Sequence, residues 1–362
     1  MKKEADKKFL LIQYTNPDNG FCAMVTSVLN CIRIAEEMNV LPVVYLGGDH
    51  GSYFFDPAVG DNIWEYYFEA IGDTFLIKEL VGREIRDERA LSIRNKKDLS
   101  FHLDPKDENY ISHFWVQDIP NDPAKWMKKK RRLGRKYVDK YVSVKKHILD
   151  KVDQFKETHF DSEYIIGVHI RGTDFGYANA ISPEQYFLQI DLHLTNINSS
   201  NWKIFLATDQ TQFVDIFCEK YPEKIIVYDS IRSSNHLAAF QTEGEKYKKG
   251  EDVLIDILLL SNTDYLIKGA SAVGEYALWF NNGLNCYDFG LNCKWDPSHY
   301  ANAALKLNVT QQNIMTWKLT LVYKKVKRSF LDLIIKTARK LLPSRLRNWM
   351  WIKFGRAIYF FK

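Results

Sequence analysis

The chain has 362 residues, of which 46% are hydrophobic and 14% aromatic, and its net charge at pH 7 is +5. This length accommodates two domains of ordinary size and a further segment, and the hydrophobic content is sufficient for buried cores. No run of about 18 apolar residues is present, which excludes a membrane span of ordinary length. The cysteines are odd in number and contain no C-x-x-C pair, so neither a disulfide framework nor a zinc site is expected. They are Cys22, Cys31, Cys218, Cys286 and Cys293.

The first part of the chain alternates between strand and helix patterns. Residues 9–14 predict a strand, residues 21–38 carry apolar side chains on one face of a helix, and residues 41–45 predict the next strand. Further on, the basic run 128–132 leads into a predicted helical stretch over residues 137–155. We expect the basic run to be the solvated face of a helix, with contact to anionic lipid or to an acceptor phosphate as the alternative.

The most informative segment is residues 168–174, which follow the apolar run 164–167 and lie where a buried strand leaves its sheet. Ligands bind at this edge of open α/β sheets. The guanidinium of Arg171 offers a planar fork of donors that suits a phosphate, and Asp174 can orient that fork by accepting from it. The segment therefore predicts a site for an anionic ligand. An Arg–Asp pair that only fixes the loop is the alternative.

Strand and helix patterns continue to alternate through the second half. Ser182 and Pro183 are typical of the cap and the first position of a helix. After that helix we expect strands over residues 202–209 and 224–229, a helix over 251–261 whose flanking acids suit its N-terminal dipole, a strand and turn over 264–271, and a helix over 272–281. This alternation predicts a parallel, Rossmann-like sheet.

In three motifs the chain resembles the fucosyltransferase superfamily, which joins the α-1,6-fucosyltransferases, the nodulation fucosyltransferases and the protein O-fucosyltransferases. The resemblance is closest to the α-1,6 branch. The motifs are residues 169–174, the strand end 205–209, and the helix 256–261 with the turn 269–271. The first half resembles the family only in the glycine-containing turn at residues 19–22.

The resemblance implies GDP-fucose as the donor. Arg171 matches an arginine that contacts the β-phosphate, where negative charge develops as GDP leaves. Ser271 matches a serine that holds the same phosphate at a helix N-terminus, with a plain N-cap as the alternative. Asp256 matches the acid that accepts from N1–H and the exocyclic amine of guanine, with a buried structural acceptor as the alternative. The remaining residues expected to line the donor site are Gly20, Phe21 and Ala270.

Three further residues receive supporting roles from the resemblance. His169 matches a histidine whose backbone or ring meets the nucleotide, with a hydrogen-bonded core residue as the alternative. Asp174 matches an acid that orients Arg171, and these two form the expected catalytic pair. Asp209 matches an acid that supports the site, and we expect it to cap the helix that follows Thr208.

Two departures from the α-1,6 branch change the expected chemistry. The branch has a second arginine where this chain has Gly172, and we expect Lys268 or a residue of the first half to replace the lost positive contact. The branch also has a glutamate, proposed to activate the acceptor hydroxyl, in the loop that corresponds to residues 175–179, which contain no carboxylate here. The general base is therefore unassigned, and an acceptor other than the core chitobiose of N-glycans is expected.

The resemblance implies an α/β fold with two Rossmann-like lobes of the GT-B glycosyltransferase type. We expect an N-terminal acceptor lobe over residues 1–158, a nucleotide-sugar lobe over 159–305 and a basic amphipathic helical tail over 306–362. Residues 318–362 hold 13 lysines or arginines and one acid, so the rest of the chain has a net charge of −7. Basic residues interleaved with Trp, Phe and Leu predict a helix at an anionic membrane and do not favour nucleic acid. A helix packed on the first lobe is the alternative.

The resulting hypothesis is an inverting fucosyltransferase that needs no metal and no cofactor besides its sugar-nucleotide donor. Since no D-x-D metal motif is present, Arg171 is expected to supply the charge that a metal supplies elsewhere. We expect a bacterial, cytoplasmic enzyme, peripheral on the inner face of the membrane, that acts on an oligosaccharide or a lipid-linked intermediate of a capsule or surface polysaccharide. The alternatives are a transferase for another sugar nucleotide and a catalytically silent nucleotide- or saccharide-binding protein.

Overall fold

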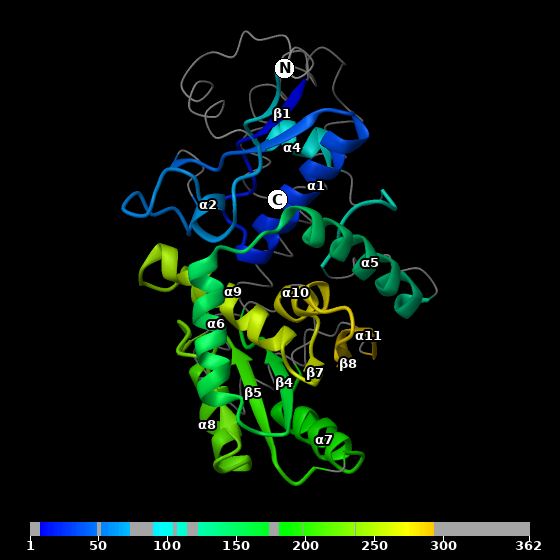
Figure 1. Ribbon diagram of the computed structural model, residues 1–362, viewed down its shortest axis with the longest axis vertical. Coiled ribbons are helices and arrows are strands. Elements are labelled where there is room, and N and C mark those ends of the chain that lie inside the picture. Colours follow the sequence, from blue (N-terminus) through cyan, green and yellow to red (C-terminus); the bar gives the residue numbers. More distant parts are fainter. Residues whose placement is uncertain are drawn as a thin grey trace, which may run out of the picture. The chain divides into compact units, whose positions relative to one another are not determined.

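The computed structural model of the chain describes residues 8–48, 52–72, 90–103, 107–113, 122–173, 181–197, 199–235 and 237–292. All of them belong to one compact unit, and residues 300–362 lie outside the described part. The predicted basic tail therefore lies outside the described residues as well. Within the described part, helices pack on two all-parallel β-sheets, which confirms the predicted α/β class (Figure 1).

The first sheet has β1 (Phe9–Ile12) between β2 (Leu41–Val44) and β3 (Ala90–Ile93). Helix α1 (Phe21–Glu37) connects β1 to β2 and begins directly after Gly20. The apolar stripe that predicts this helix is buried against the sheet. The three elements predicted in this region are therefore confirmed to within one or two residues. Two short helices complete the described part of this half, α2 (Trp64–Tyr67) and α4 (Lys96–His102).

The helical stretch predicted over residues 137–155 is helical except at residues 142–145, where the structure divides it into two helices, α5 (Pro123–Tyr141) and α6 (Lys146–His159). Between them the backbone bonds like a strand to the segment after α2, since Glu69 N donates to Ser143 O at 2.8 Å and Lys145 N donates to Tyr67 O at 3.0 Å. Val144, which is β-branched and disfavours helix, pairs there in an antiparallel bridge. This tertiary pairing ends α5.

The second sheet has the strand order β6-β5-β4-β7-β8. Its strands are β4 (Tyr164–Ile170), β5 (Trp202–Thr208), β6 (Ile225–Ile226), β7 (Tyr265–Lys268) and β8 (Asn285–Asp288). Its helices are α7 (Pro183–Leu194), α8 (Thr211–Lys220), α9 (Lys246–Ser261), α10 (Ala272–Phe280) and α11 (Phe289–Asn292), with a short 3-10 turn, η2 (Ala239–Gln241). The chain order reverses between β4 and β7, so the carboxyl ends of these two strands flank the switch point where ligands bind in such sheets.

Two predictions for this half need correction. The strand predicted over residues 224–229 is confined to Ile225–Ile226, because the chain then turns into a loop. Helix α9 begins at Lys246, so Glu251 and Asp252 do not flank its N-terminus and the proposed match to the helix dipole is wrong. These acids instead accept from lysines, Glu251 from Lys151 and Asp252 from Lys248. The residues before Glu251 are mostly good helix formers, which extends the helix by more than a turn.

Helix α10 connects the two halves of the described unit, the first half being the residues before β4 and the second half those from β4 onward. The hydroxyl of Tyr276 on α10 donates to the carbonyl of Cys22 on α1 at 3.2 Å and lies 2.8 Å from Thr26 Oγ1. Arg131 on α5 reaches the carboxylate of Glu275, also on α10. One continuous hydrophobic core runs through both sheets. The start of α10 is consequently held by contacts from both halves. None of the described helices has the length and apolar character that crossing a membrane requires.

Candidate functional site

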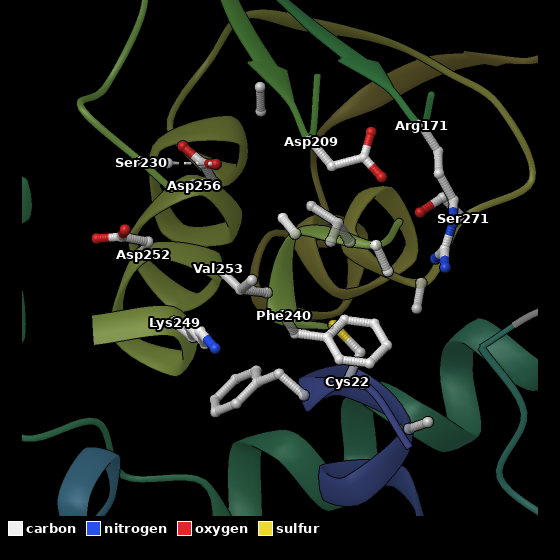
Figure 2. A pocket seen from close by; sticks show the side chains of 18 of the residues that line it. Cys22, Arg171, Asp209, Ser230, Phe240, Lys249, Asp252, Val253, Asp256 and Ser271 are labelled. Carbon is white, nitrogen blue, oxygen red and sulfur yellow. Dashed lines mark hydrogen bonds between the residues drawn. The ribbon is translucent and has the colours of Figure 1, made fainter. Parts of the chain in front are cut away.

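A pocket of about 330 Å³ lies at the carboxyl edge of the second sheet and is closed by residues of the first half (Figure 2). Most of the predicted site residues line it, namely Gly20, Phe21, His169, Arg171, Asp209, Asp256 and Ser271. Ala270 lines a smaller neighbouring cavity instead. Asp174 and the loop 175–179 lie outside the described residues. The motifs chosen from the sequence therefore converge in one place.

Arg171 follows the last residue of β4 and extends into the pocket (Figure 2). Its Nε donates to the carbonyl of Thr173 at 3.3 Å. The positive charge contributes to lowering the pKa of two buried neighbours, His113 and His169, after the larger effect of burial. The guanidinium thus supplies positive charge to a site lined by buried residues, where an anion is held more strongly than in water.

Asp209 holds the loop that follows β4. Its carboxylate accepts from the backbone N of Gly172 at 2.6 Å and from Thr173 Oγ1 at 2.5 Å. The helix that follows, α8, begins at Thr211 without a side-chain cap, so the predicted capping role of Asp209 is wrong. Asp209 instead fixes the two residues that follow Arg171, which makes it a positioning residue for the guanidinium.

Gly172 stands where no side chain fits. A Cβ added there would lie 2.1 Å from Oε1 of Gln210, whose Nε2 donates to the carbonyl of Asn235 at 2.8 Å. Gln210 is 3% exposed, so its amide is packed among neighbouring residues. The structure therefore explains why position 172 is not a second arginine here, because Gln210 occupies the space that an arginine side chain would need.

Gly172→Ala is expected to destabilise the fold by about 1–3 kcal/mol, because the added methyl overpacks against Gln210. Urea unfolding of the single variant measures this loss. In the double variant Gly172→Ala/Gln210→Ala the clash is removed, so its loss is expected to be smaller than the sum of the two single losses. Strictly additive losses would show that the two positions do not compete for space.

Ser271 occupies the cap position of α10 but makes no capping hydrogen bond. Its Oγ is buried and has no partner among the described residues, although the residue lines the pocket. The alternative that Ser271 serves as a plain N-cap is therefore wrong. Its backbone N donates to the carbonyl of Gly269 at 2.9 Å, which fixes the turn.

Asp256 lies on the face of α9 that borders the pocket and is 8% exposed (Figure 2). Its Oδ2 accepts from Ser230 Oγ at 3.1 Å, whereas Oδ1 has no partner among the described residues. Burial raises the pKa of Asp256 to about 7, against the opposing effect of the Arg232 charge. A purely structural acceptor would have both oxygens satisfied, so the half-satisfied carboxylate favours a ligand contact.

His169 is buried at the end of β4 with Nδ1 unpartnered among the described residues. Burial, together with the charges of Arg171 and Lys268, lowers the pKa of its imidazole to about 3, so the ring is neutral at pH 7. Its backbone carbonyl accepts from the hydroxyl of Tyr186 at 3.1 Å. A neutral imidazole offers one donor and one acceptor, which suits contact with a nucleotide.

Several residues that line the pocket were not predicted from the sequence. They are Cys22, Phe54, His113, Ser230, Phe240, Lys249, Asp252 and Val253. Lys249, Val253 and Asp256 follow the i, i+4, i+7 spacing of one helix face. A predicted helix that began at Lys246 would have placed the three side chains on the same face. Phe54 and Phe240 lie outside the longer helices and strands, and nothing in their local sequence marks them.

Lys268 does not line this pocket, which contradicts the expectation that it replaces the second arginine. It is 1% exposed, and its Nζ pairs with Glu275 at 2.7 Å and with Asp288 at 2.9 Å. Arg131 pairs with the same two carboxylates at 2.5 Å each. These four residues form an ion quartet, in which Lys268, Glu275 and Asp288 are buried and Arg131 is partly exposed. Lys268 and Arg131 hold the pKa of Glu275 well below its usual range despite burial.

The basic run at residues 128–132 is only partly solvated, contrary to the expected exposed helix face. Arg131 belongs to the ion quartet. Lys130 is 3% exposed, and its Nζ donates to the carbonyls of Glu108 at 2.8 Å and Tyr110 at 2.7 Å. Two of the five charges therefore hold α5 in place. Long basic side chains pack along apolar surfaces while their heads find acceptors, and a charge count does not reveal this.

The described residues contain no cluster of three or more His, Cys, Asp or Glu side chains placed to hold a metal ion.

Comparisons with known proteins locate the family resemblance. The model of the family "Alpha-(1,6)-fucosyltransferase N- and catalytic domains" matches residues 134–273. The comparison with curated protein sequences gives no match. Among solved structures, the fucosyltransferase NodZ from Bradyrhizobium is 18% identical over 75% of this chain and 93% of its own, with a TM-score of 0.42. POFUT1 in complex with GDP-fucose is 10% identical over 80% of this chain and 99% of its own, with a TM-score of 0.45.

The segment that matches the family model contains the second-half residues that line the pocket, from His169 and Arg171 through Asp209 and Asp256 to Ser271. The resemblance of this chain to the fucosyltransferase superfamily, drawn from its three motifs, is thereby confirmed.

Proposed function

We propose that the chain is an inverting glycosyltransferase that transfers fucose from GDP-fucose to a saccharide acceptor. Its two α/β halves would serve as the acceptor and donor lobes of a GT-B enzyme. One observation carries the proposal, namely that three buried polar atoms without partners among the described residues border a single pocket. These atoms are Asp256 Oδ1, His169 Nδ1 and Ser271 Oγ. Unsatisfied buried polar atoms are costly, and a polar ligand that pairs with them removes that cost.

The guanine base would bind at Asp256. A carboxylate can accept from N1–H and from the exocyclic amine of guanine together, and neither adenine nor uracil offers that pair of donors. Ser230 holds the other oxygen of Asp256, so the carboxylate is already oriented when the base arrives. A site built to accept two hydrogen bonds rejects bases that cannot donate them.

The diphosphate would bind between Arg171 and the start of α10. Negative charge on GDP increases as the bond to fucose breaks, so positive charge placed beside the β-phosphate stabilises the transition state more than the ground state. The Arg171 guanidinium supplies that charge, and the backbone N–H groups after Ser271 add the positive end of the helix dipole. This arrangement needs no metal ion, and metal independence is part of the proposal.

Calorimetry with GDP, UDP and ADP in the presence of EDTA tests the donor assignment. We expect GDP to bind at least about tenfold more tightly than the other two, because only guanine satisfies Asp256. Asp256→Asn is expected to remove most of this preference. Equal affinities for the three nucleotides would overturn the assignment of guanine to this pocket.

The affinity for guanine nucleotides is expected to rise with pH through the pKa of Asp256. With a pKa of about 7 in the free protein, the carboxyl group is protonated below pH 7 and cannot accept from both guanine donors. The affinity should therefore increase about tenfold between pH 6 and pH 8, with a proton released on binding at the lower pH. Titrations with guanosine, which carries no phosphate, separate this effect from the titration of GDP itself. A flat profile for guanosine would contradict it.

We also propose that the acceptor is a lipid-linked intermediate of a bacterial surface polysaccharide and that residues beyond about 318 hold the enzyme at the inner face of an anionic membrane. The charge excess and the bulky apolar residues of that segment support this proposal.

Removing residues 330–362 is expected to release the protein from anionic vesicles and to spare its activity on a small soluble acceptor. Each basic residue near such a surface contributes about 1 kcal/mol and salt screens it, so high salt should partly mimic the truncation. Vesicle sedimentation measures the effect. Unfolding of the truncated chain would instead indicate a packed helix and overturn the membrane proposal.

A further inference from the structure

Lys249 is a buried cation in the pocket that the proposed donor chemistry does not use. Its side chain lies among the pocket residues on α9, and the residue is 8% exposed (Figure 2). Its Nζ donates to the carbonyl of Thr242 at 2.5 Å. Among the described residues no carboxylate pairs with it, whereas its neighbour Lys248 pairs with Asp252. Buried ammonium groups are normally paired, so this one lacks the counter-charge that its position calls for.

The position of Lys249 separates it from the proposed guanine site. It precedes Asp256 by seven residues on the same face of α9, which places it about 10 Å away along the helix axis. From Asp256 back to Lys249, α9 runs toward the first half of the chain. The ring of Tyr247 on α9 stacks there on the ring of Tyr67 on α2, with 5.5 Å between the ring centroids. Lys249 therefore lies at the end of the pocket that the first half closes.

That end of the pocket has an aromatic lining. The rings of Phe54 and Phe240 lie 6.3 Å apart, and Phe240 Cε1 lies 3.1 Å from where a Cβ on Gly20 would be. Aromatic faces and edges are surfaces on which the apolar faces of sugar rings pack. The lining thus combines a surface for a sugar ring with one buried positive charge.

We infer that Lys249 binds an anionic group, a carboxylate or a phosphate, on the acceptor saccharide. This inference rests on the proposed function, since it takes the Asp256–Arg171 side of the pocket to be filled by GDP-fucose. The carbonyl of Thr242 accepts only one of the hydrogen bonds that the Lys249 ammonium can donate. A charged oxygen beside Nζ would accept another and supply the missing counter-charge. The acceptor is accordingly an acidic saccharide, and Lys249 selects it against neutral ones.

Binding of sugars to the full-length protein saturated with GDP tests this inference by NMR titration. One pair of probes is a glucuronate-containing disaccharide and its methyl ester, and a second pair is N-acetylglucosamine 1-phosphate and N-acetylglucosamine. We expect the charged member of at least one pair to bind about tenfold more tightly. The pair that shows the preference tells whether the anionic group is a carboxylate or a phosphate.

Three variants complete the test. Lys249→Met should abolish the preference for the charged sugar and leave the affinity for GDP unchanged, while Lys249→Arg should retain the preference. Lys246→Met is the matched control, because Lys246 is an exposed lysine on the same helix that does not line the pocket. Absence of a preference in the parent protein, including absence of any sugar binding, would overturn the inference. A large loss of GDP affinity in Lys249→Met would place this residue in the donor site and overturn it as well. Failure of the parent protein to bind GDP would instead reject the proposed function.

Discussion

Arg171→Ala is expected to lower the rate of fucose transfer at least about a hundredfold, because charge on the departing GDP would develop without its cationic partner. Removing one contact to such a charge in an enclosed site typically costs about 3 kcal/mol of barrier. Arg171→Lys should also be poor, since a single ammonium does not reproduce the planar fork of donors. Steady-state rates with GDP-fucose, measured as GDP release, provide the comparison.

The fold of both Arg171 variants should survive, and thermal unfolding serves as the control. The residue follows the end of β4 at the pocket, and the backbone next to it is held by Asp209 independently of the guanidinium. The affinity for guanosine should also be unchanged, because the proposed function assigns the base to Asp256, at the other end of the donor site. Turnover close to that of the parent protein would mean that another group stabilises the leaving diphosphate.

Glu275→Ala is expected to destabilise the protein by about 3–5 kcal/mol, because it leaves one carboxylate for two cations, the buried Lys268 and the partly buried Arg131. Lys268 would then keep a single carboxylate partner, Asp288, which it shares with Arg131. Urea unfolding measures the loss. The exposed pair of Lys146 and Asp150 on α6 is the matched control, and Asp150→Ala should cost no more than about 1 kcal/mol.

The stabilisation from Glu275 should depend on pH in a defined direction. Its pKa is lowered in the folded state from an ordinary value of 4.5, so its contribution is present above that value and is lost as the pH falls further. The difference in stability between the parent protein and Glu275→Ala should therefore narrow in acid. A difference below about 1 kcal/mol at neutral pH would show that the quartet does not hold α10 in place.

The strands and helices that frame the pocket were predictable from the sequence because their signals are local. The apolar run of β4, the Ser–Pro start of α7 and the strand-and-turn of β7 each lie within a few residues, and the structure confirms them. The start of α9 was placed too late because the segment before Glu251 is polar, although its residues form helix well. β3 was missed because four residues of ordinary composition carry little periodic signal.

The contacts that complete the site were not predictable, because they join residues far apart in the chain. Arg131 meets its two carboxylate partners across 144 and 157 residues. No local sequence pattern distinguishes Lys268, whose ammonium pairs with the two carboxylates of that quartet, from a lysine that binds phosphate. The same holds for Gln210, which fills the space beside Gly172, and for Phe240, which closes the pocket against α1.

Release of GDP from GDP-fucose by the purified full-length chain tests the central claim most directly. In EDTA, with a panel of acidic and neutral saccharides as acceptors, we predict turnover of GDP-fucose that exceeds turnover of GDP-mannose and UDP-galactose at least tenfold. Arg171→Ala, carried through the same assay, should show almost none. GDP binding without turnover of any sugar nucleotide would indicate a binding protein, and preferential turnover of a different sugar nucleotide would show that the donor is not GDP-fucose.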